Sequence, residues 1–184
     1  RADAVALAKN MISLPRHPKY NTFKKRGSAV YGRMRLLGAL EQYELWDALI
    51  AACESNLIEP TEDEKEIRKR LHLLGVAYAR AGKLNEADRV LGEFEAMLDD
   101  AALPEVVEPP AEEGEKKKEE AKESTEEKKF KALKKALDPL MAEIRALREA
   151  SAGDFDAAKA QLATAKNMNK MRLAQVHLAC GQTN

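Results

Sequence analysis

The clearest hydrophobic pattern in the chain lies between Arg68 and Ala101. Its first half predicts an amphipathic helix, because large apolar residues recur at near-helical spacing beside small ones that let a second helix approach. Gly82 follows, where a helix C-terminus often turns left-handed. A second helix is predicted after it, with Asn85 as N-cap and Glu86 near the positive end of the helix dipole. The apolar positions are Leu71, Leu74, Val76 and Tyr78, then Ala87, Val90, Leu91, Phe94, Met97 and Leu98, with Gly75 and Ala79 small.

The same stretch carries a family resemblance in the order of Leu74-Gly75, Tyr78, Gly82, Leu84, Ala87 and Leu91. This order resembles the 34-residue tetratricopeptide repeat (TPR). It departs from the TPR pattern at Leu71, where Trp is usual, at Phe94, where Ala is usual, and at Asp99, which replaces the closing Pro. The match covers about a fifth of the chain, one repeat. The resemblance implies an all-α fold of antiparallel helical hairpins stacked as an α-solenoid with a right-handed superhelical tendency.

Weaker helical patterns precede this hairpin. A helix is predicted from Ala2 to Leu14, and Pro15 and Pro18 then form a turn. The next helices are expected over 28–42 and 45–57. The inward positions of the first two helices are predicted to be Ala4, Val5, Leu7, Ala8, Met11 and Ile12, then Val30, Met34, Leu37 and Leu40.

A capping box is predicted at Thr61, after Pro60 ends the preceding helix. The Thr61 hydroxyl can accept a hydrogen bond from the Glu64 amide while the Glu64 side chain reaches back. The sequence Thr-Glu-Asp-Glu therefore marks the start of the helix that runs through Tyr78.

The chain after the hairpin divides into two parts. Residues 103–127 hold prolines, a glycine and dense mixed charge with almost nothing to bury, so we expect a solvated linker. Helical periodicity resumes at Lys128, with a kink expected at Pro139, and Gly153 is predicted to close that helix. The segment after Gly153 resembles the second helix of a TPR, and the last residues resemble a further first helix with His177 at the Tyr78 position. The expected organisation is 1–101, helical hairpins; 102–127, linker or insertion; and 128–184, a hairpin and a truncated repeat.

Bulk composition narrows the classes of protein that fit. The chain has 184 residues with a formal net charge of zero, which argues against wholesale attraction to nucleic acid or acidic membranes. Only 5% of residues are aromatic, and no β-type alternation occurs. No apolar run in the sequence is long enough for a membrane span. Cys53 and Cys180 form no CxxC motif, and both are predicted to be buried thiols.

A candidate binding groove follows from the TPR resemblance. In TPR proteins that hold C-terminal carboxylates, the inner helix faces carry a clamp of Lys, Asn and Arg. The matching positions here lack the Asn elements, which favours a partner recognised through a more apolar groove. These candidate groove residues are Lys69, His72, Leu73, Val76 and Arg80.

A second candidate site is a basic segment with interleaved aromatic residues and no carboxylate between Asp3 and Glu41. It fits an acidic peptide, a phosphate or a nucleic acid. Alternatively, these charges solvate a loop and pair with the acidic residues that follow. The basic-segment residues are Arg16, His17, Lys19, Lys24, Lys25, Arg26, Arg33 and Arg35.

Catalytic and cofactor motifs are not found in the sequence. His17, His72 and His177 have no metal-site spacing, and there is no calcium loop, phosphate-binding loop or GxSxG motif. We therefore expect no catalytic residues, no metal and no cofactor.

Three hypotheses for function follow. The first is a non-catalytic interaction or scaffold segment of a larger bacterial protein, as both ends suggest a fragment, with a protein or peptide partner in a concave groove. The second is a spacer that positions a catalytic module, because 15–21 and 43–47 resemble helical regions attached to thioredoxin-like modules. The third is phosphate or nucleic-acid binding through residues 16–35.

Overall fold

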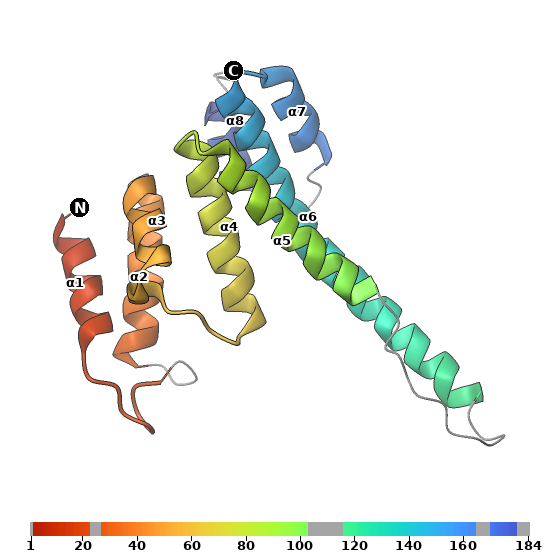
Figure 1. Cartoon of the computed structure of the whole chain (residues 1–184), viewed down its shortest axis with the longest axis horizontal. Coiled ribbons are helices and arrows are strands. Elements are labelled where there is room, and N and C mark those ends of the chain that lie inside the picture. The colour runs from red at the N-terminus through yellow and green to blue at the C-terminus, as the bar shows by residue number, and fades with distance from the viewer. Residues whose placement is uncertain (1, 23–26, 103–115, 165–169, 180–184) are drawn as a thin grey trace. The chain divides into compact units, whose positions relative to one another are not determined.

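The computed structural model describes residues 2–22, 27–102, 116–164 and 170–179. All regular elements in these ranges are helical, which confirms the all-α prediction (Figure 1). The chain forms two compact units, Arg1–Lys83 and Leu84–Asn184. The division between them falls between Lys83 and Leu84, whereas the sequence suggested divisions near residues 101 and 127.

The first unit contains four α-helices and one 3₁₀ turn in its described residues. They are α1 (Ala2–Ser13), α2 (Ser28–Gln42), α3 (Trp46–Glu54), η1 (Asn56–Ile58) and α4 (Glu64–Arg80). Successive helices pack on one another, α1 on α2, α2 on α3 and α3 on α4. The predicted helix over 28–42 has the bounds that the sequence suggested.

The contact of α1 with α2 depends on Gly32. A Cβ at Gly32 would lie 2.9 Å from the backbone nitrogen of Ile12 and 2.9 Å from the Cβ of Met11. The missing side chain therefore lets the two helix backbones approach closely. Ala8, Ile12, Leu36 and Leu40 fill the buried faces of the two helices.

Three helices end in the same kind of turn. The amide of Leu45 donates to the carbonyl of Leu40, that of Lys83 to Tyr78, and that of Asp154 to Glu149. The residue before each of these donors has a positive φ: 53° at Glu44, 73° at Gly82 and 87° at Gly153. These are Schellman motifs, and they confirm the helix ends predicted at Gly82 and Gly153.

Two predicted N-caps are wrong. Asp63 caps α4, because its Oδ1 accepts from the amides of Lys65 and Glu66, while the Thr61 hydroxyl accepts from the amide of Asp63. The cap therefore lies two residues after Thr61, and Glu64 is the first helical residue. Asn85 is likewise inside a helix that begins at Leu84, so it is not the N-cap.

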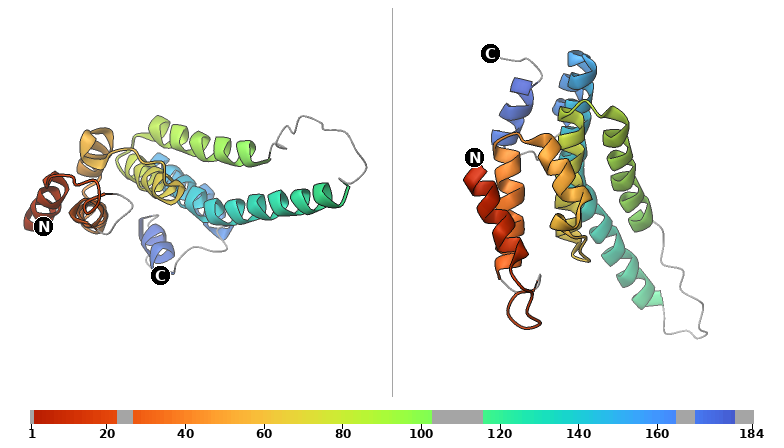
Figure 2. Two further views of the ribbon diagram at one scale, coloured as in Figure 1. Left: turned by 90° about the horizontal axis from the view of Figure 1, so that it is seen from below. Right: turned by 60° about the vertical axis from the view of Figure 1, so that its left-hand side comes forward.

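The second unit contains α5 (Leu84–Ala102), α6 (Lys116–Ala152), α7 (Phe155–Thr164) and α8 (Lys170–Ala179). Helix α6 packs against each of the other three. It begins at Lys116, so part of the segment expected to be linker is helical, and the helix continues through Pro139. Residues 103–115 lie outside the described residues. Figures 1 and 2 show α5 and α6 side by side, with α6 running past the end of α5.

Candidate functional site

The candidate groove residues on α4 are exposed or half-buried at the two ends of the set and buried in its middle. Lys69 is exposed, and His72 and Arg80 are half-buried. Leu73 and Val76, however, are each only 3% exposed. Arg80 pairs with Glu44 at 3.1 Å and lies over the Trp46 ring at 5.7 Å. The two apolar residues expected to hold a partner are therefore buried in the protein.

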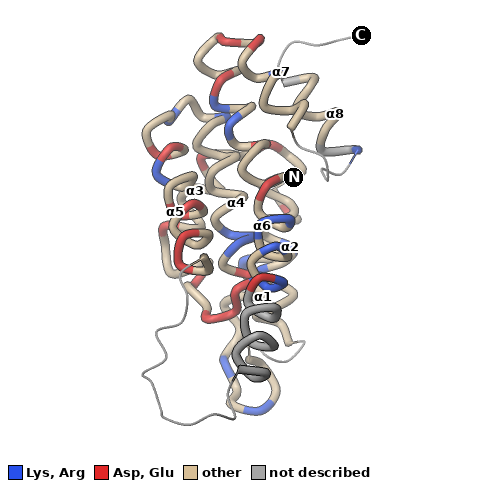
Figure 3. Tube along the Cα trace, turned by 90° about the vertical axis from the view of Figure 1, so that its right-hand side faces the viewer, with Lys and Arg blue, Asp and Glu red and all other residues tan. Residues whose placement is uncertain are grey.

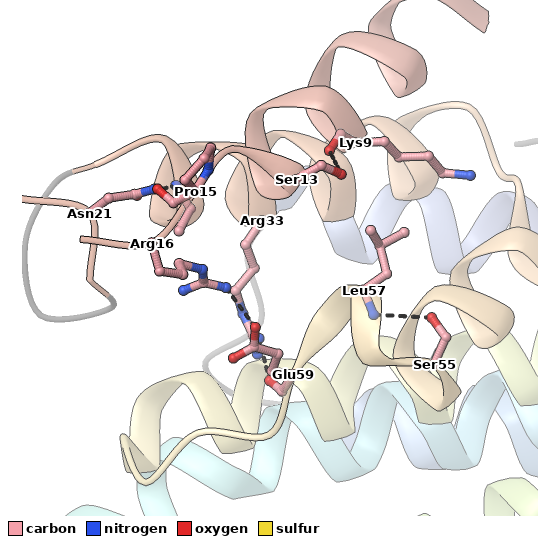
Figure 4. Close-up of polar contacts among 10 residues, drawn as sticks. Lys9, Ser13, Pro15, Arg16, Asn21, Arg33, Ser55, Leu57 and Glu59 are labelled. Carbon is pink, nitrogen blue, oxygen red and sulfur yellow. Dashed lines mark hydrogen bonds and ion pairs between the residues drawn. The ribbon is translucent and has the colours of Figure 1, made fainter. Parts of the chain in front are cut away.

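The basic segment is partly neutralised by carboxylates of the same unit. Arg16 pairs with the Glu59 carboxylate at 2.6 Å, and Arg33 pairs with Glu66 at 3.3 Å. Arg33 also donates to the backbone carbonyl of Glu59, so both arginines meet at this residue (Figure 4). This geometry supports, for Arg16 and Arg33, the alternative that these charges pair within the chain.

Arg33 is a buried cation, with only 4% of its surface exposed. Burial of a charge is costly unless it is paired and hydrogen-bonded. The carboxylate of Glu66 and the carbonyl of Glu59 meet that requirement, and they tie α2 to α4 and to the segment before it. Arg33 is therefore a structural residue in this unit.

The remaining basic-segment residues divide into exposed ones and ones outside the described residues. His17, Lys19 and Arg35 are exposed. The His17 ring lies 4.7 Å from the Tyr20 ring, and its Nδ1 accepts from the amide of Lys19. The segment Lys24–Arg26 lies outside the described residues.

An apolar row on α1 is the main surface feature that the sequence reading missed. Ala4, Leu7 and Met11 were predicted to point inward, and together with Leu14, which directly follows the end of α1, they are called the α1 row. Leu7 is 63% exposed and Leu14 is 51% exposed, while Ala4 is exposed and Met11 half-buried. The prediction of an inward position is therefore wrong for Ala4 and Leu7.

The signal for this row was present in the sequence. The α1 row has spacings of three, four and three residues, as in a helix–helix seam. A neighbouring row of Val5, Ala8 and Ile12 contacts the interior instead, with Ala8 and Ile12 buried. Together the two rows make an apolar arc about half the helix circumference, and α2 covers only one side of it.

The reactive side chains do not form a recognisable chemical site. Within the described ranges no group of three or more His, Cys, Asp and Glu residues could hold a metal ion. Cys53 is buried, as predicted, and burial raises the pKa of its thiol, which Arg70 and Arg33 partly oppose. Cys180 lies outside the described residues. No helix among those searched combines the length and the apolar character that a membrane span requires.

Over the described residues the protein is all-helical, and within each unit helices pack on one another. Comparisons with protein-family models, with curated proteins and with solved structures found no match.

Proposed function

We propose that this chain is a non-catalytic protein-interaction segment that binds an amphipathic helix of a partner protein along the α1 row. The observation that carries the proposal is the exposure of Leu7 on α1 and of Leu14 directly after its end. Large apolar side chains aligned on an exposed helix face are a common mark of an interaction surface.

The spacing of the α1 row fits a partner helix. Positions four and three residues apart on one face are those that interdigitate between two packed helices. Full burial of a Leu side chain contributes about 1.5–3 kcal/mol, so the exposed Leu7 and Leu14 together offer a sizeable driving force. A partner helix with its own apolar seam would supply the matching surface.

The α1 row replaces α4 as the proposed binding surface. Burial of Leu73 and Val76 leaves α4 without the apolar groove that the TPR resemblance implied. The repeated Schellman turns after α2, α4 and α6 support a TPR-like repetition of hairpins, and we keep a solenoid of such hairpins as part of the proposal.

The test is site-directed crosslinking followed by direct binding. A photoreactive residue at Ala4, beside Leu7, should capture a partner, whereas the same residue at Ala6, on another exposed face, should not. With that partner purified, the double variant Leu7→Glu/Leu14→Glu should bind at least about tenfold more weakly, which corresponds to 1.4 kcal/mol. The matched control Ala6→Glu/Asn10→Glu adds the same charge to another exposed part of α1 and should bind normally.

Two results would overturn this proposal. One is equal weakening by the two double variants. The other is capture of a second copy of the chain at Ala4 with loss of self-association in Leu7→Glu/Leu14→Glu, because the row would then be a self-association surface.

A spacer function is the second candidate, and the length of α6 favours it. At 37 residues, α6 spans about 55 Å at 1.5 Å per residue. The pair of Lys131 with Glu127, one turn apart, is of the kind that stabilises solvent-exposed helices. A spacer would tolerate Leu7→Glu/Leu14→Glu without loss of function, but it would be sensitive to a change in the length of α6.

Binding of nucleic acid through residues 16–35 stays a third and weaker hypothesis. Pairing of Arg16 and Arg33 with Glu59 and Glu66 reduces the charge available to phosphates. Titration with a single-stranded oligonucleotide at several salt concentrations tests it, because phosphate contacts give a steep salt dependence.

A further inference from the structure

Helix α6 carries a seam with alternating spacings of three and four residues. The seam consists of Phe130, Leu133, Leu137, Leu140, Ile144 and Leu147. Leu137 and Ile144 are fully buried, and Leu147 is nearly so. Phe130, Leu133 and Leu140 are half-buried. The same apolar pattern thus continues N-terminal to the fully buried positions.

The register of α5 on α6 determines which part of the seam α5 packs against. Arg148 binds Asp88 through two bonds of 3.1 Å, and Arg145 binds Glu95 at 2.7 Å. These pairs set an antiparallel register in which Ala102, the last residue of α5, lies level with about residue 136 of α6. By this register Phe130 and Leu133 lie past the end of α5, and Figures 1 and 2 show that α6 extends beyond α5.

Lysines flank this part of the seam, which lies past the end of α5. If Phe130 and Leu133 are the core positions a and d of a heptad, Lys129 and Lys134 occupy the adjoining g and e positions. Both lysines are exposed. Lys128 and Lys135 lie on the opposite side of α6, away from the seam. We call Lys129, Phe130, Leu133 and Lys134 the tip patch.

The charges at positions e and g select the kind of partner. In paired helices these positions face each other across the seam, and their charges set partner choice. Two copies of α6 joined at the tip patch would place lysine opposite lysine in either orientation. A second copy of α6 is therefore disfavoured, and so is any helix with basic flanks. Figure 3 shows acidic residues along α5, the helix that already covers the rest of the seam.

We propose that the tip patch docks an acidic amphipathic helix of another protein, with apolar residues over Phe130 and Leu133 and carboxylates facing Lys129 and Lys134. This contact belongs to the second unit and uses none of the α1 row. It therefore extends the interaction function to a second surface, and the two can be tested separately.

The competing occupant is the chain itself. Residues 103–115 contain five glutamates and no Lys or Arg, so they share the chemistry of the proposed partner. The experiment must separate these two sources of acidic residues.

The test uses the full chain and two synthetic helical peptides of four heptads with Leu at a and d. One peptide has Glu at e and g, and the other has Lys. Fluorescence anisotropy at low salt should show the acidic peptide binding at least about tenfold more tightly than the basic one, since two charge pairs distinguish them.

Charge reversal provides the decisive comparison. Lys129→Glu/Lys134→Glu should exchange the preference, so that the basic peptide binds and the acidic one does not. The matched control Lys128→Glu/Lys135→Glu makes the same change in net charge on the opposite side and should keep the preference for the acidic peptide. Leu133→Asp should abolish binding of both peptides, with circular dichroism confirming that the helix content is kept.

Other outcomes would overturn the proposal. It fails if neither peptide binds, or if the two double variants change the preference equally. It also fails if the acidic peptide binds only after residues 103–115 are replaced by a Gly-Ser segment of equal length, because the chain would then occupy its own patch. Leu7→Glu/Leu14→Glu should bind the acidic peptide normally, so a failure here leaves the proposal for the α1 row intact, and the reverse also holds.

Discussion

Gly32 of α2 lies against Ile12 of α1 so closely that a Cβ at Gly32 would come within 2.8 Å of the Ile12 side chain and 2.9 Å of its backbone nitrogen. Contacts below 3.0 Å force an atom to move, and a backbone nitrogen cannot move without the helix that carries it. This one residue therefore sets the separation of α1 and α2, and with it the position of the α1 row.

Gly32→Ala should destabilise the protein by about 1–3 kcal/mol, because the added methyl group overpacks the α1–α2 contact. The matched control is Gly38→Ala in the same helix, where no atom lies within 4 Å of the added Cβ. Gly38→Ala should stabilise by about 0.5–1 kcal/mol, since Ala has the higher helix propensity. Urea unfolding measures both, and shifts of the same sign would contradict the close approach at Gly32.

Arg33→Met should cost about 1.5–3 kcal/mol, because it removes a buried cation's hydrogen bonds to the Glu59 carbonyl and to Glu66. Arg35→Met, the exposed neighbour, should change stability by less than about 0.5 kcal/mol. Glu66→Gln should cost less than Arg33→Met, since the Glu66 side chain is 42% exposed and that pair is screened by water. Thermal unfolding of the three variants measures these losses of stability and ranks them. Equal losses for Arg33→Met and Arg35→Met would show that Arg33 is not structural.

The sequence was sufficient to predict the elements that depend on local chemistry. The turns at Gly82 and Gly153 were predictable because a positive φ strongly favours glycine. The turn at Glu44 has the same backbone conformation but no glycine, so no local signal marked it. The start of α4 was misplaced because Thr61 and Asp63 are both competent caps, and the choice between them depends on where the chain leaves η1.

Positions that depend on neighbouring helices were harder to predict. Leu7 and Ile12 belong to one wide apolar arc, and only the placement of α2 decides that Ile12 is buried and Leu7 exposed. Arg33 looked like a surface charge, because the partners that permit its burial, Glu59 and Glu66, are distant in the sequence. The early start of α6 was missed because residues 116–127 have almost no apolar residues. A helix rich in Glu and Lys can nevertheless form without a core through pairs one turn apart.

The buried thiol of Cys53 should make stability depend on pH in the alkaline range. Burial raises the pKa of this thiol in the folded state above its value of about 8.5 in unfolded chains. At pH values below the pKa that the thiol has in the unfolded chain, it is protonated in both states, so it adds no pH dependence to the free energy of unfolding. As pH rises past that value the unfolded state loses the proton first, so the free energy of unfolding falls, by at most about 1.4 kcal/mol per pH unit.

The measurement compares a Cys180→Ser variant, in which Cys53 is the single thiol, with the same variant carrying Cys53→Ala. The difference in free energy of unfolding between the two variants should shrink or reverse in sign between pH 8 and pH 10, because ionisation of Cys53 in the unfolded state destabilises only the variant that contains it. Ellman's reagent should also react with Cys53 far more slowly in native buffer than in urea. A difference that is constant with pH, together with fast labelling of the native protein, would show that Cys53 is accessible to solvent.

The register of α5 on α6 can be tested through Arg148 and Asp88. Their paired bonds of 3.1 Å raise the pKa of the Arg148 guanidinium, chiefly through the hydrogen bonds and the charge of Asp88. Both side chains are partly exposed, so a double-mutant cycle of Arg148→Ala and Asp88→Ala should give a coupling energy of only about 0.5–1 kcal/mol. That energy should fall when the salt concentration is raised to about 1 M, where the Debye length is near 3 Å.

A cycle between Arg148 and Glu95 serves as the control and should show no coupling, because Glu95 pairs with Arg145 instead. Coupling of Arg148 to Glu95 in place of Asp88 would mean a shifted register, in which the end of α5 lies about seven residues further along α6 from Phe130 and Leu133.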